Sequence, residues 1–394
     1  MEVNKTWNQH VVKQENKALV LRKIIESSPI TRPMIANETG LNKGTVSSLV
    51  NQLLEEKIIY ESGPGESSGG RRPVMLLYNQ VAGYSIGIDI GVNYMLGIIT
   101  DLQGNIHHEE LIKFSNLSFE EITGKLFGII DLLLSTAPSS PYGIIGIGIG
   151  VPGVVDRSEE ILLAPNLGWR NIKLKEILEE KYNLPITIEN EANAGAYGEK
   201  MFGAGKDFNN IIYVSDGIGI GVGLILNGEL YRGNNGFSGE LGHMTIEVNG
   251  DKCRCGNNGC WELYASEQAL LKNAERLEII TAQDGELSLE SLIELANSGD
   301  IEAIRLFEDL GHYLGVGINN IINTFNPQQV IIGNRIATAK KWLTEALLNR
   351  SNQTLSFNQK GLQIDFSELS THSTALGVAA FSVDNFLVKE IFSL

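Results

Sequence analysis

The chain has 394 residues, of which 43% are hydrophobic and 20% are charged, and its formal net charge is −16 at pH 7. This length exceeds what one hydrophobic core usually supports, so two or three domains are expected. Because no stretch approaches the roughly 20 apolar residues that cross a bilayer, and the polar N-terminus lacks the order of a secretory signal, we expect a cytoplasmic protein with no membrane partner.

The charge is distributed unevenly along the chain. Residues 1–80 contain ten Lys or Arg and eight Asp or Glu, a balance of +2, whereas the remaining residues carry −18. An acidic body repels DNA phosphates, so any contact with DNA would be confined to the N-terminal module. A small neutral domain with no such partner fits the same numbers, and charge alone does not decide between the two.

Three short helices are predicted in this N-terminal module. Apolar residues at helical spacing over residues 16–27 predict the first helix, which Pro29 closes. Thr31 as N-cap and Pro33 in the first turn predict the second, which ends at Gly40. Asn42 can cap a third. Three helices this close together predict a helix-turn-helix.

The third predicted helix is amphipathic. One face carries apolar side chains, namely Val46, Leu49, Val50, Leu53 and Leu54. Lys43, Thr45 and Ser47 lie on the polar side, where they can reach phosphates and base edges without steric bulk. We therefore predict that these three residues contact DNA.

Two strand-like runs follow the third helix, at residues 58–60 and 74–78, joined by the loop SGPGESSGGRR. A hairpin in this position is typical of a wing, and Arg71 and Arg72 would meet phosphates or the minor groove. The loop taken alone also fits a solvated linker between domains. Together with the three helices, it predicts a winged helix-turn-helix DNA-binding domain over residues 1–80.

From Gly83 onwards, strand-like and helix-like segments alternate. Glycine turns stand at the strand ends of three segments, at 83–106, 144–153 and 211–226. This alternation predicts an α/β sheet protein whose loops surround a polar ligand.

All three cysteines of the chain lie within eight residues, shortly after a histidine. In a reducing compartment, His243, Cys253, Cys255 and Cys260 make a tetrahedral set for one Zn²⁺. The alternative is a buried thiol cluster or an odd disulfide. Since four protein ligands leave no open position for water, the predicted zinc is structural and not catalytic.

Polar side chains flank this predicted zinc knuckle. Glu240 lies one helical turn before His243, and Glu262 follows the last cysteine by two residues. Carboxylates beside an imidazole suit the hydroxyls of a sugar, although surface carboxylates without a ligand are the alternative. Asn190 and Glu191 lie at the end of an apolar strand and before a helix, where α/β proteins hold ligands.

The run ELGHMTIEVNGDKCRCGNNGCWELYAS resembles the defining motif of the ROK family, which groups bacterial sugar kinases and sugar-responsive repressors. IENEANAGAYGE, GVPGVVD and SDGIGIGVG are similar to its other motifs, so the resemblance covers residues 83–394. It implies an actin-like, ribonuclease-H-like pair of α/β lobes with sugar bound in the cleft between them. We expect residues 81–198, rejoined by the C-terminal helix 373–394, to form the first lobe, and residues 199–372 to form the second.

The resemblance also implies site residues and partners. It places the sugar contacts on Gly153, Asn190, Glu191, Glu240, His243 and Glu262, and the zinc ligands on His243, Cys253, Cys255 and Cys260. Because a winged helix precedes the lobes, the chain most resembles the family's repressors of xylose operons. This implies a homodimer on two-fold operator DNA that D-xylose releases, with a hexose as the alternative ligand.

Departures from the kinase pattern of the family favour a repressor over an enzyme. Where the kinases have Asp-x-Gly-Gly-Thr, the chain has Asp89 and a glycine followed by Val92 and Asn93. Ile218 replaces the threonine of the second phosphate loop, and Glu191 occupies the position of the catalytic aspartate. The retained Asp89 and the intact sugar motif leave an ATP-dependent sugar kinase with a DNA-binding module as the alternative.

Overall fold

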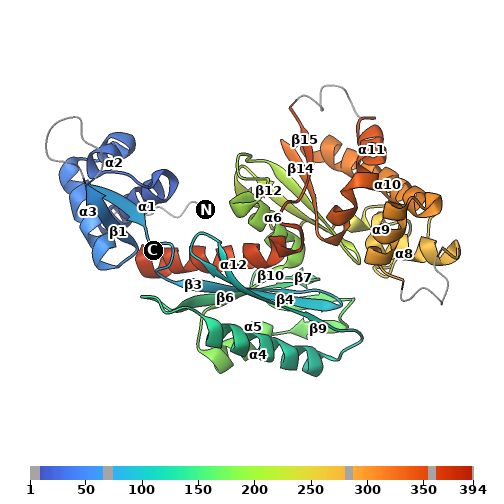
Figure 1. The fold of residues 1–394 in the computed structure, drawn as a ribbon, viewed down its shortest axis with the longest axis horizontal. Coiled ribbons are helices and arrows are strands. Elements are labelled where there is room, and N and C mark those ends of the chain that lie inside the picture. The colour runs from blue at the N-terminus through green and yellow to red at the C-terminus, as the bar shows by residue number, and fades with distance from the viewer. Residues whose placement is uncertain (1–8, 65–73, 280–286, 354–360, 393–394) are drawn as a thin grey trace.

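A computed structural model describes residues 9–64, 74–279, 287–353 and 361–392. At one end of the molecule, the N-terminal residues form a winged helix-turn-helix (Figure 1). Its elements are α1 (Gln9–Ser27), α2 (Arg32–Thr39), α3 (Lys43–Glu55) and an antiparallel hairpin of β1 (Ile59–Pro64) and β2 (Val74–Tyr78). Helix α1 begins earlier than the predicted residue 16. The apolar spacing did not indicate the earlier start, because residues 9–15 are mostly exposed and carry no apolar stripe.

The predicted helix ends are confirmed. The side chain of Thr31 accepts a backbone N–H from the first turn of α2 at 3.4 Å, and Gly40 ends this helix with a φ of 72°. Asn42 Oδ1 accepts the backbone N–H of Thr45 at 2.8 Å and so begins α3. The predicted DNA contacts Arg71 and Arg72 lie outside the described residues.

A five-stranded sheet follows, with the strand order β10-β6-β3-β4-β5. Its strands are β3 (Tyr84–Ile90), β4 (Tyr94–Asp101), β5 (Ile106–Lys113), β6 (Ile144–Val151) and β10 (Ile186–Asn190). Helices α4 (Phe119–Thr136) and α5 (Leu174–Tyr182) pack on one face, and the C-terminal helix α12 (Ser373–Phe386) returns to cover the other. A small sheet of β7 (Val154–Val155), β8 (Ile161–Ala164) and β9 (Trp169–Ile172) lies between β6 and α5 in the chain.

Alternating isoleucine and glycine in β3 and β6 explain why α12 lies so close to this sheet. The isoleucines point into the core under α4 and α5, and the glycines face α12. A Cβ atom at Gly87 would lie 2.0 Å from the carbonyl oxygen of Ala375, and one at Gly148 would lie 2.1 Å from that of Val378. Larger residues at these two positions would push the helix off the sheet.

A second five-stranded sheet has the order β13-β12-β11-β14-β15. Its strands are β11 (Ile211–Asp216), β12 (Ile220–Leu226), β13 (Glu229–Leu230), β14 (Gln329–Gly333) and β15 (Gln363–Phe366). The helices of this part are α7 (Glu262–Ala265), α8 (Glu267–Arg276), α9 (Leu289–Ser298), α10 (Ile301–Phe325) and α11 (Lys340–Ser351), and they share one large core with β11, β12 and β14.

Helices α6 (Glu191–Phe202) and α12 lie between the two sheets (Figure 1). A Cβ atom at Gly377 of α12 would lie 1.8 Å from the carbonyl oxygen of Ala194 in α6. One at Gly223 of β12 would lie 2.3 Å from that of Ala192. Helix α6 therefore contacts both α12 and the second sheet, and its first residue, Glu191, lies where the two lobes meet. This arrangement agrees with the predicted two-lobed α/β fold.

The far end of α12 and the following π-helical turn η5 (Leu387–Ile391) pack against the winged helix. Val383, Phe386 and Ile391 share a hydrophobic core with the three N-terminal helices. The rings of Phe386 and Tyr142 meet at 4.9 Å between centroids, and the Tyr142 hydroxyl donates to the backbone carbonyl of Glu56 at 2.9 Å. One helix thus runs from the junction of the lobes to the winged helix. Within the described residues, none of the helices has both the length and the apolar character needed to cross a membrane.

Candidate functional site

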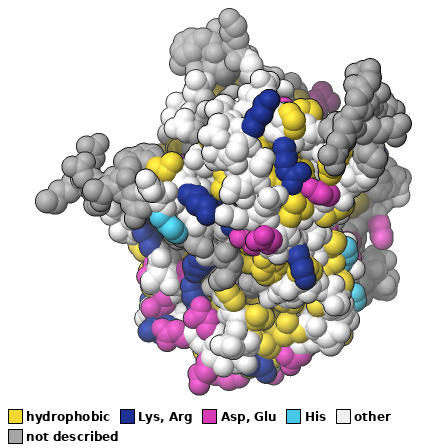
Figure 2. Space-filling view, turned by 90° about the vertical axis from the view of Figure 1, so that its left-hand side faces the viewer, with side chains coloured by type: hydrophobic (Ala, Val, Ile, Leu, Met, Phe, Trp, Pro, Cys, Tyr) yellow, Lys and Arg dark blue, Asp and Glu magenta, His cyan; other side chains and the backbone are white. Residues whose placement is uncertain are grey.

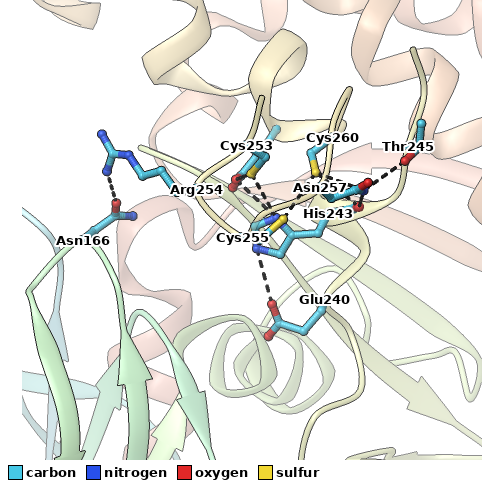
Figure 3. A network of polar contacts seen from close by, with 10 residues as sticks. Asn166, Glu240, His243, Thr245, Cys253, Arg254, Cys255, Asn257 and Cys260 are labelled. Carbon is cyan, nitrogen blue, oxygen red and sulfur yellow. Dashed lines mark hydrogen bonds and ion pairs between the residues drawn. The ribbon is translucent and has the colours of Figure 1, made fainter. Parts of the chain in front are cut away.

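His243 and the three cysteines lie together in space (Figure 3). Their ligand atoms all lie within 4.8 Å of one another. His243 Nδ1 is 3.6 Å from Cys253 Sγ, and Cys255 Sγ is 3.7 Å from Cys260 Sγ. In a tetrahedral site with bonds of about 2.3 Å to sulfur and about 2.0 Å to nitrogen, neighbouring ligand atoms are about 3.6 to 3.8 Å apart. The four side chains therefore fit a tetrahedral metal ion.

Two glycines give this knuckle its bends. Gly256 and Gly259 have φ angles of 97° and 65°, which favour glycine. At Gly259 a Cβ atom would lie 1.7 Å from the carbonyl oxygen of Glu247, so no larger residue fits there. The short helix η1 (Leu241–His243) brings the histidine to the cysteines.

The carboxylates predicted beside the knuckle lie on two sides of the imidazole. Glu240 Oε2 is 3.9 Å from His243 Nε2, on the side away from the thiols. Glu262 Oε1 is 3.3 Å from His243 Nδ1 and 3.2 Å from Cys253 Sγ, so Glu262 borders the metal-ligand set itself. The Nε2 atom of His243 and the Glu240 carboxylate are therefore the groups that face away from the cluster.

The other predicted sugar contacts form a second group at the edge of the first sheet. Asn190 caps α6, since its Oδ1 accepts backbone N–H groups of Ala192 and Asn193 at 2.9 and 3.1 Å. Its Nδ2 donates to the carbonyl oxygen of Gly153 at 2.9 Å. Most of the hydrogen-bonding capacity of Asn190 is thus used to hold the Gly153 loop against the start of α6, beside Glu191.

Gly219, just before β12, and Gly221, within it, lie between the two groups. A Cβ atom at Gly219 would lie 2.9 Å from Glu262 Oε2, and one at Gly221 would lie 3.9 Å from Glu191 Oε1. The structure therefore brings the six residues predicted to contact sugar to one region. Within it, Gly219 and Gly221 lie between Glu191 and the knuckle.

The carboxyl groups of Glu191 and Asp89 lie in surroundings of low polarity. Burial and the nearby charges of Asp89 and Glu240 raise the pKa of Glu191 to about 8. Burial also raises the pKa of Asp89 to about 7, although the hydroxyl of Tyr94, which donates to Asp89 Oδ2 at 2.6 Å, acts in the opposite direction. Asp89 Oδ1 is buried and has no hydrogen-bond partner among the described residues.

Two arginines that the sequence analysis did not single out link the lobes. Arg232 Nε lies 2.7 Å from Glu189 Oε2, next to Asn190. Arg254 lies within the knuckle and donates to Asn166 Oδ1 at 2.9 Å (Figure 3). The sequence shows that Arg254 lies between two cysteines of the cluster, whereas nothing in the sequence indicates its partner Asn166.

The predicted DNA contacts on α3 are spread around the helix. Lys43 is exposed near its start, whereas Thr45 and Ser47 are half-buried. Ser48 and Asn51, together with Gly44, occupy the fully exposed face, and their spacing of four and three residues could have identified them. Figure 2, which faces this end of the molecule, shows Lys and Arg side chains interspersed with acidic ones over its upper and middle parts, and further acidic side chains toward its lower edge.

Comparisons with known proteins agree with this architecture. The model of the ROK family matches residues 85–385. The xylose repressor of Bacillus subtilis (strain 168) is 48% identical over 382 residues, which cover 96% of this chain and 98% of that protein. Among solved structures, a ROK family transcriptional regulator, a homologue of the Escherichia coli MLC protein, superposes with a TM-score of 0.81 at 27% identity and covers 98% of this chain and 100% of that one.

An enzyme shares the two-lobed part. A ROK family glucokinase from Streptomyces griseus, in complex with glucose and AMPPNP, has a TM-score of 0.70 at 28% identity. The match covers 76% of this chain and 99% of the glucokinase. From the family model and the near-complete coverage of its 48% identical relative, this chain belongs to the ROK family.

Proposed function

We propose that the chain is a transcriptional repressor of a xylose-utilisation operon and that D-xylose releases it from operator DNA. The observation that carries this proposal is the 48% identity to a xylose repressor over 96% of the chain, which includes both the winged helix and the two lobes. The chain acts as a regulator and not as an enzyme.

The winged helix supplies the contact with the operator. Lys43 at the start of α3 neutralises phosphate charge, Thr45 and Ser47 reach the flanks of the groove, and Ser48 and Asn51 face the base edges. Arg71 and Arg72 contact the phosphates or the minor groove. Because one winged helix reads only a few base pairs, a homodimer on a two-fold site provides the required specificity.

Zinc is the metal that suits the knuckle. Three thiolates and an imidazole at tetrahedral spacing are ligands that Zn²⁺ prefers, and His243, Cys253, Cys255 and Cys260 would hold one ion per chain. When bound, this ion cross-links the knuckle and supplies no open position for catalysis. The knuckle then holds Glu240 and the Nε2 atom of His243 toward the sugar.

The ligand is a neutral sugar. Glu191 and Glu240, with Asn190 and Gly153 beside them, accept or donate hydrogen bonds to hydroxyls, and none of these four residues offers a positive charge to a phosphorylated sugar. The assignment of D-xylose follows from the name of the relative.

Helix α12 connects this site to the winged helix. Thr374 Oγ1, near its start, donates to the carbonyl oxygen of Glu191 at 3.1 Å, and Phe386 at its end packs in the winged-helix core. A sugar that binds one arrangement of the lobes more tightly moves this helix and, with it, the spacing of the two DNA-binding domains in the dimer.

The test is operator binding by the purified, zinc-loaded protein in the absence of sugar, with D-xylose and with D-glucose. We expect D-xylose to weaken operator binding. Unchanged affinity with D-xylose contradicts the inducer assignment, and release by D-glucose alone identifies a hexose-responsive repressor.

One observation favours an ATP-dependent sugar kinase as the second candidate, namely the retained Asp89 in a fold shared with a glucokinase. Against this function, Tyr94 bonds Asp89, and Ile218 offers no hydroxyl to a phosphate. A turnover with ATP and xylose or glucose on the order of 1 to 100 per second would establish the kinase. If none is found, the variant carrying Val92→Gly and Ile218→Thr tests whether the altered loops are the cause.

A further inference from the structure

The ring of Tyr94 covers the turn between β3 and β4. A Cβ atom at Gly91 would lie 2.2 Å from Cε1 of this ring, so the ring lies directly on the backbone of the turn. Its hydroxyl donates to Asp89 Oδ2 at 2.6 Å. The ring also packs against a small buried cluster that includes Leu96 of β4 and Leu376 of α12. These contacts together restrict the position of the ring.

This ring lies near the residues proposed to bind sugar. Asp89 pairs in register with Gly150 on β6, and Gly150 pairs with Glu189 on β10, so Asp89 lies two strands, about 10 Å, from the strand that leads into Glu191. Beside burial, the charge of Asp89 helps raise the pKa of Glu191, and both carboxyl groups help raise the pKa of the Tyr94 hydroxyl, so the three side chains lie near one another. Thr374 lies against Gly150 and donates to the Glu191 carbonyl oxygen. The pair formed by Tyr94 and Asp89 thus borders the same space as Glu191.

We propose that Tyr94 determines the size of the sugar that this site accepts, because its fixed ring, bonded to Asp89, forms the wall of the site at the turn between β3 and β4. D-Xylose and D-glucose differ only in the hydroxymethyl group on C5, so a rigid wall that excludes this group selects the pentose. The inference rests on the proposed function in one respect, namely that the ligand is a neutral sugar. A single extra or missing carbon group in a fitted pocket changes binding by roughly 10- to 200-fold.

The experiment measures the dissociation constants of D-xylose and D-glucose by titration calorimetry on the full-length, zinc-loaded protein. In Tyr94→Ala, where the wall is removed, we expect the affinity ratio of xylose to glucose to fall by about tenfold or more. Tyr94→Phe keeps the ring and loses only the hydrogen bond to Asp89, so the ratio stays close to that of the wild type. Tyr94→Leu keeps apolar packing against Leu96 and Leu376, and it tests the same shift if the alanine variant fails to fold.

Tyr182→Ala is the matched control. Tyr182 also donates its hydroxyl to an aspartate, Asp131, at 2.9 Å, but it lies on α5, on the opposite face of the first sheet. We expect no change in the sugar ratio for this variant. An unchanged ratio in folded Tyr94→Ala or Tyr94→Leu, with both sugars bound, overturns the size assignment and leaves the proposed function in place. If the wild type binds neither sugar, the proposed function fails and this inference fails with it.

Discussion

The Nζ atom of Lys17 donates a 2.6 Å hydrogen bond to the backbone carbonyl oxygen of Ile391, so the first helix of the winged helix is joined to the π-helical turn η5. Lys17 is only 4% exposed, and it also lies 2.6 Å from Glu56 Oε1 at the end of α3. This lysine therefore ties two helices of the DNA-binding domain to the segment that continues α12.

Replacing Lys17 with methionine should weaken the connection between the sugar site and the winged helix. A buried hydrogen bond to a charged group contributes about 1.5 to 3 kcal/mol, so we expect a lower melting temperature. Operator binding without sugar should persist, whereas the effect of the inducing sugar on it should shrink. Thermal unfolding and operator titrations with and without D-xylose measure the two effects.

Lys23→Met is the control for this change. Lys23 lies on the same helix and forms surface ion pairs with Glu26 and Glu38, which solvent screens, so they contribute little to stability. If both variants respond to sugar like the wild type, the C-terminal segment does not transmit the signal.

Metal removal should affect sugar binding before DNA binding. The knuckle holds Glu240 and His243, whereas the winged helix has its own hydrophobic core at the other end of the molecule. We expect one Zn²⁺ per chain by elemental analysis and a loss of sugar binding after chelation or in Cys260→Ser, with operator affinity largely retained. Reduced protein that contains no zinc but binds sugar normally would contradict the assignment.

The carboxyl of the half-buried Glu191 predicts a dependence of stability on pH. Its pKa of about 8 in the folded protein lies above the ordinary value of 4.5, because of burial and the charges of Asp89 and Glu240. The folded state therefore holds this proton more tightly than the unfolded state does, so the stabilisation is complete below the ordinary pKa and is lost as the pH rises through about 8. Tyr94 faces the same group and stays protonated in this range, since burial raises its pKa.

Glu191→Gln removes this dependence. We expect the melting temperature of the variant to rise relative to the wild type as the pH increases from about 5 to about 9. Glu308→Gln, at an exposed position of α10, controls for the loss of one negative charge. A constant difference between Glu191→Gln and the wild type across this range would show that the carboxyl does not titrate there.

Variants of α3 should distinguish residues that contact phosphate from residues that contact bases. Lys43→Ala should weaken binding to all sequences and reduce the slope of log affinity against log salt by about 0.9, since one counterion contact is lost. Lys341→Ala, on α11 of the second lobe, should leave the slope unchanged. An unaltered slope in the Lys43 variant would remove this residue from the DNA interface.

Asn51→Ala should act differently, because Asn51 lies on the exposed face of α3 and an asparagine can pair with an adenine edge. We expect a loss of about 1 to 3 kcal/mol on the preferred operator and a smaller loss on operators altered at the contacted base. Equal losses on all operators would make Asn51 a phosphate contact.

Features that depend on near neighbours could be predicted from the sequence. The helix-turn-helix follows from caps within a few residues, such as Thr31, Gly40 and Asn42. The cluster of His243 and the three cysteines, which could hold a metal ion, follows in the same way, because these residues lie within one short stretch and positive-φ glycines bend it. In both cases the chemistry is local, so spacing alone identifies it.

Features that depend on distant pairs were decided only by the tertiary structure. Thr374 meets the carbonyl of Glu191 from 183 residues away, and Lys17 meets Ile391 across 374 residues. In the sequence, the glycines of β3 and β6 cannot be distinguished from ordinary turn and strand residues. Only the structure shows that α12 packs across them. The position of Tyr94 over Gly91 belongs to the same class. The sequence allows many such contacts, and packing selects among them. A close approach of two elements requires a glycine on one element and a partner element positioned opposite that glycine.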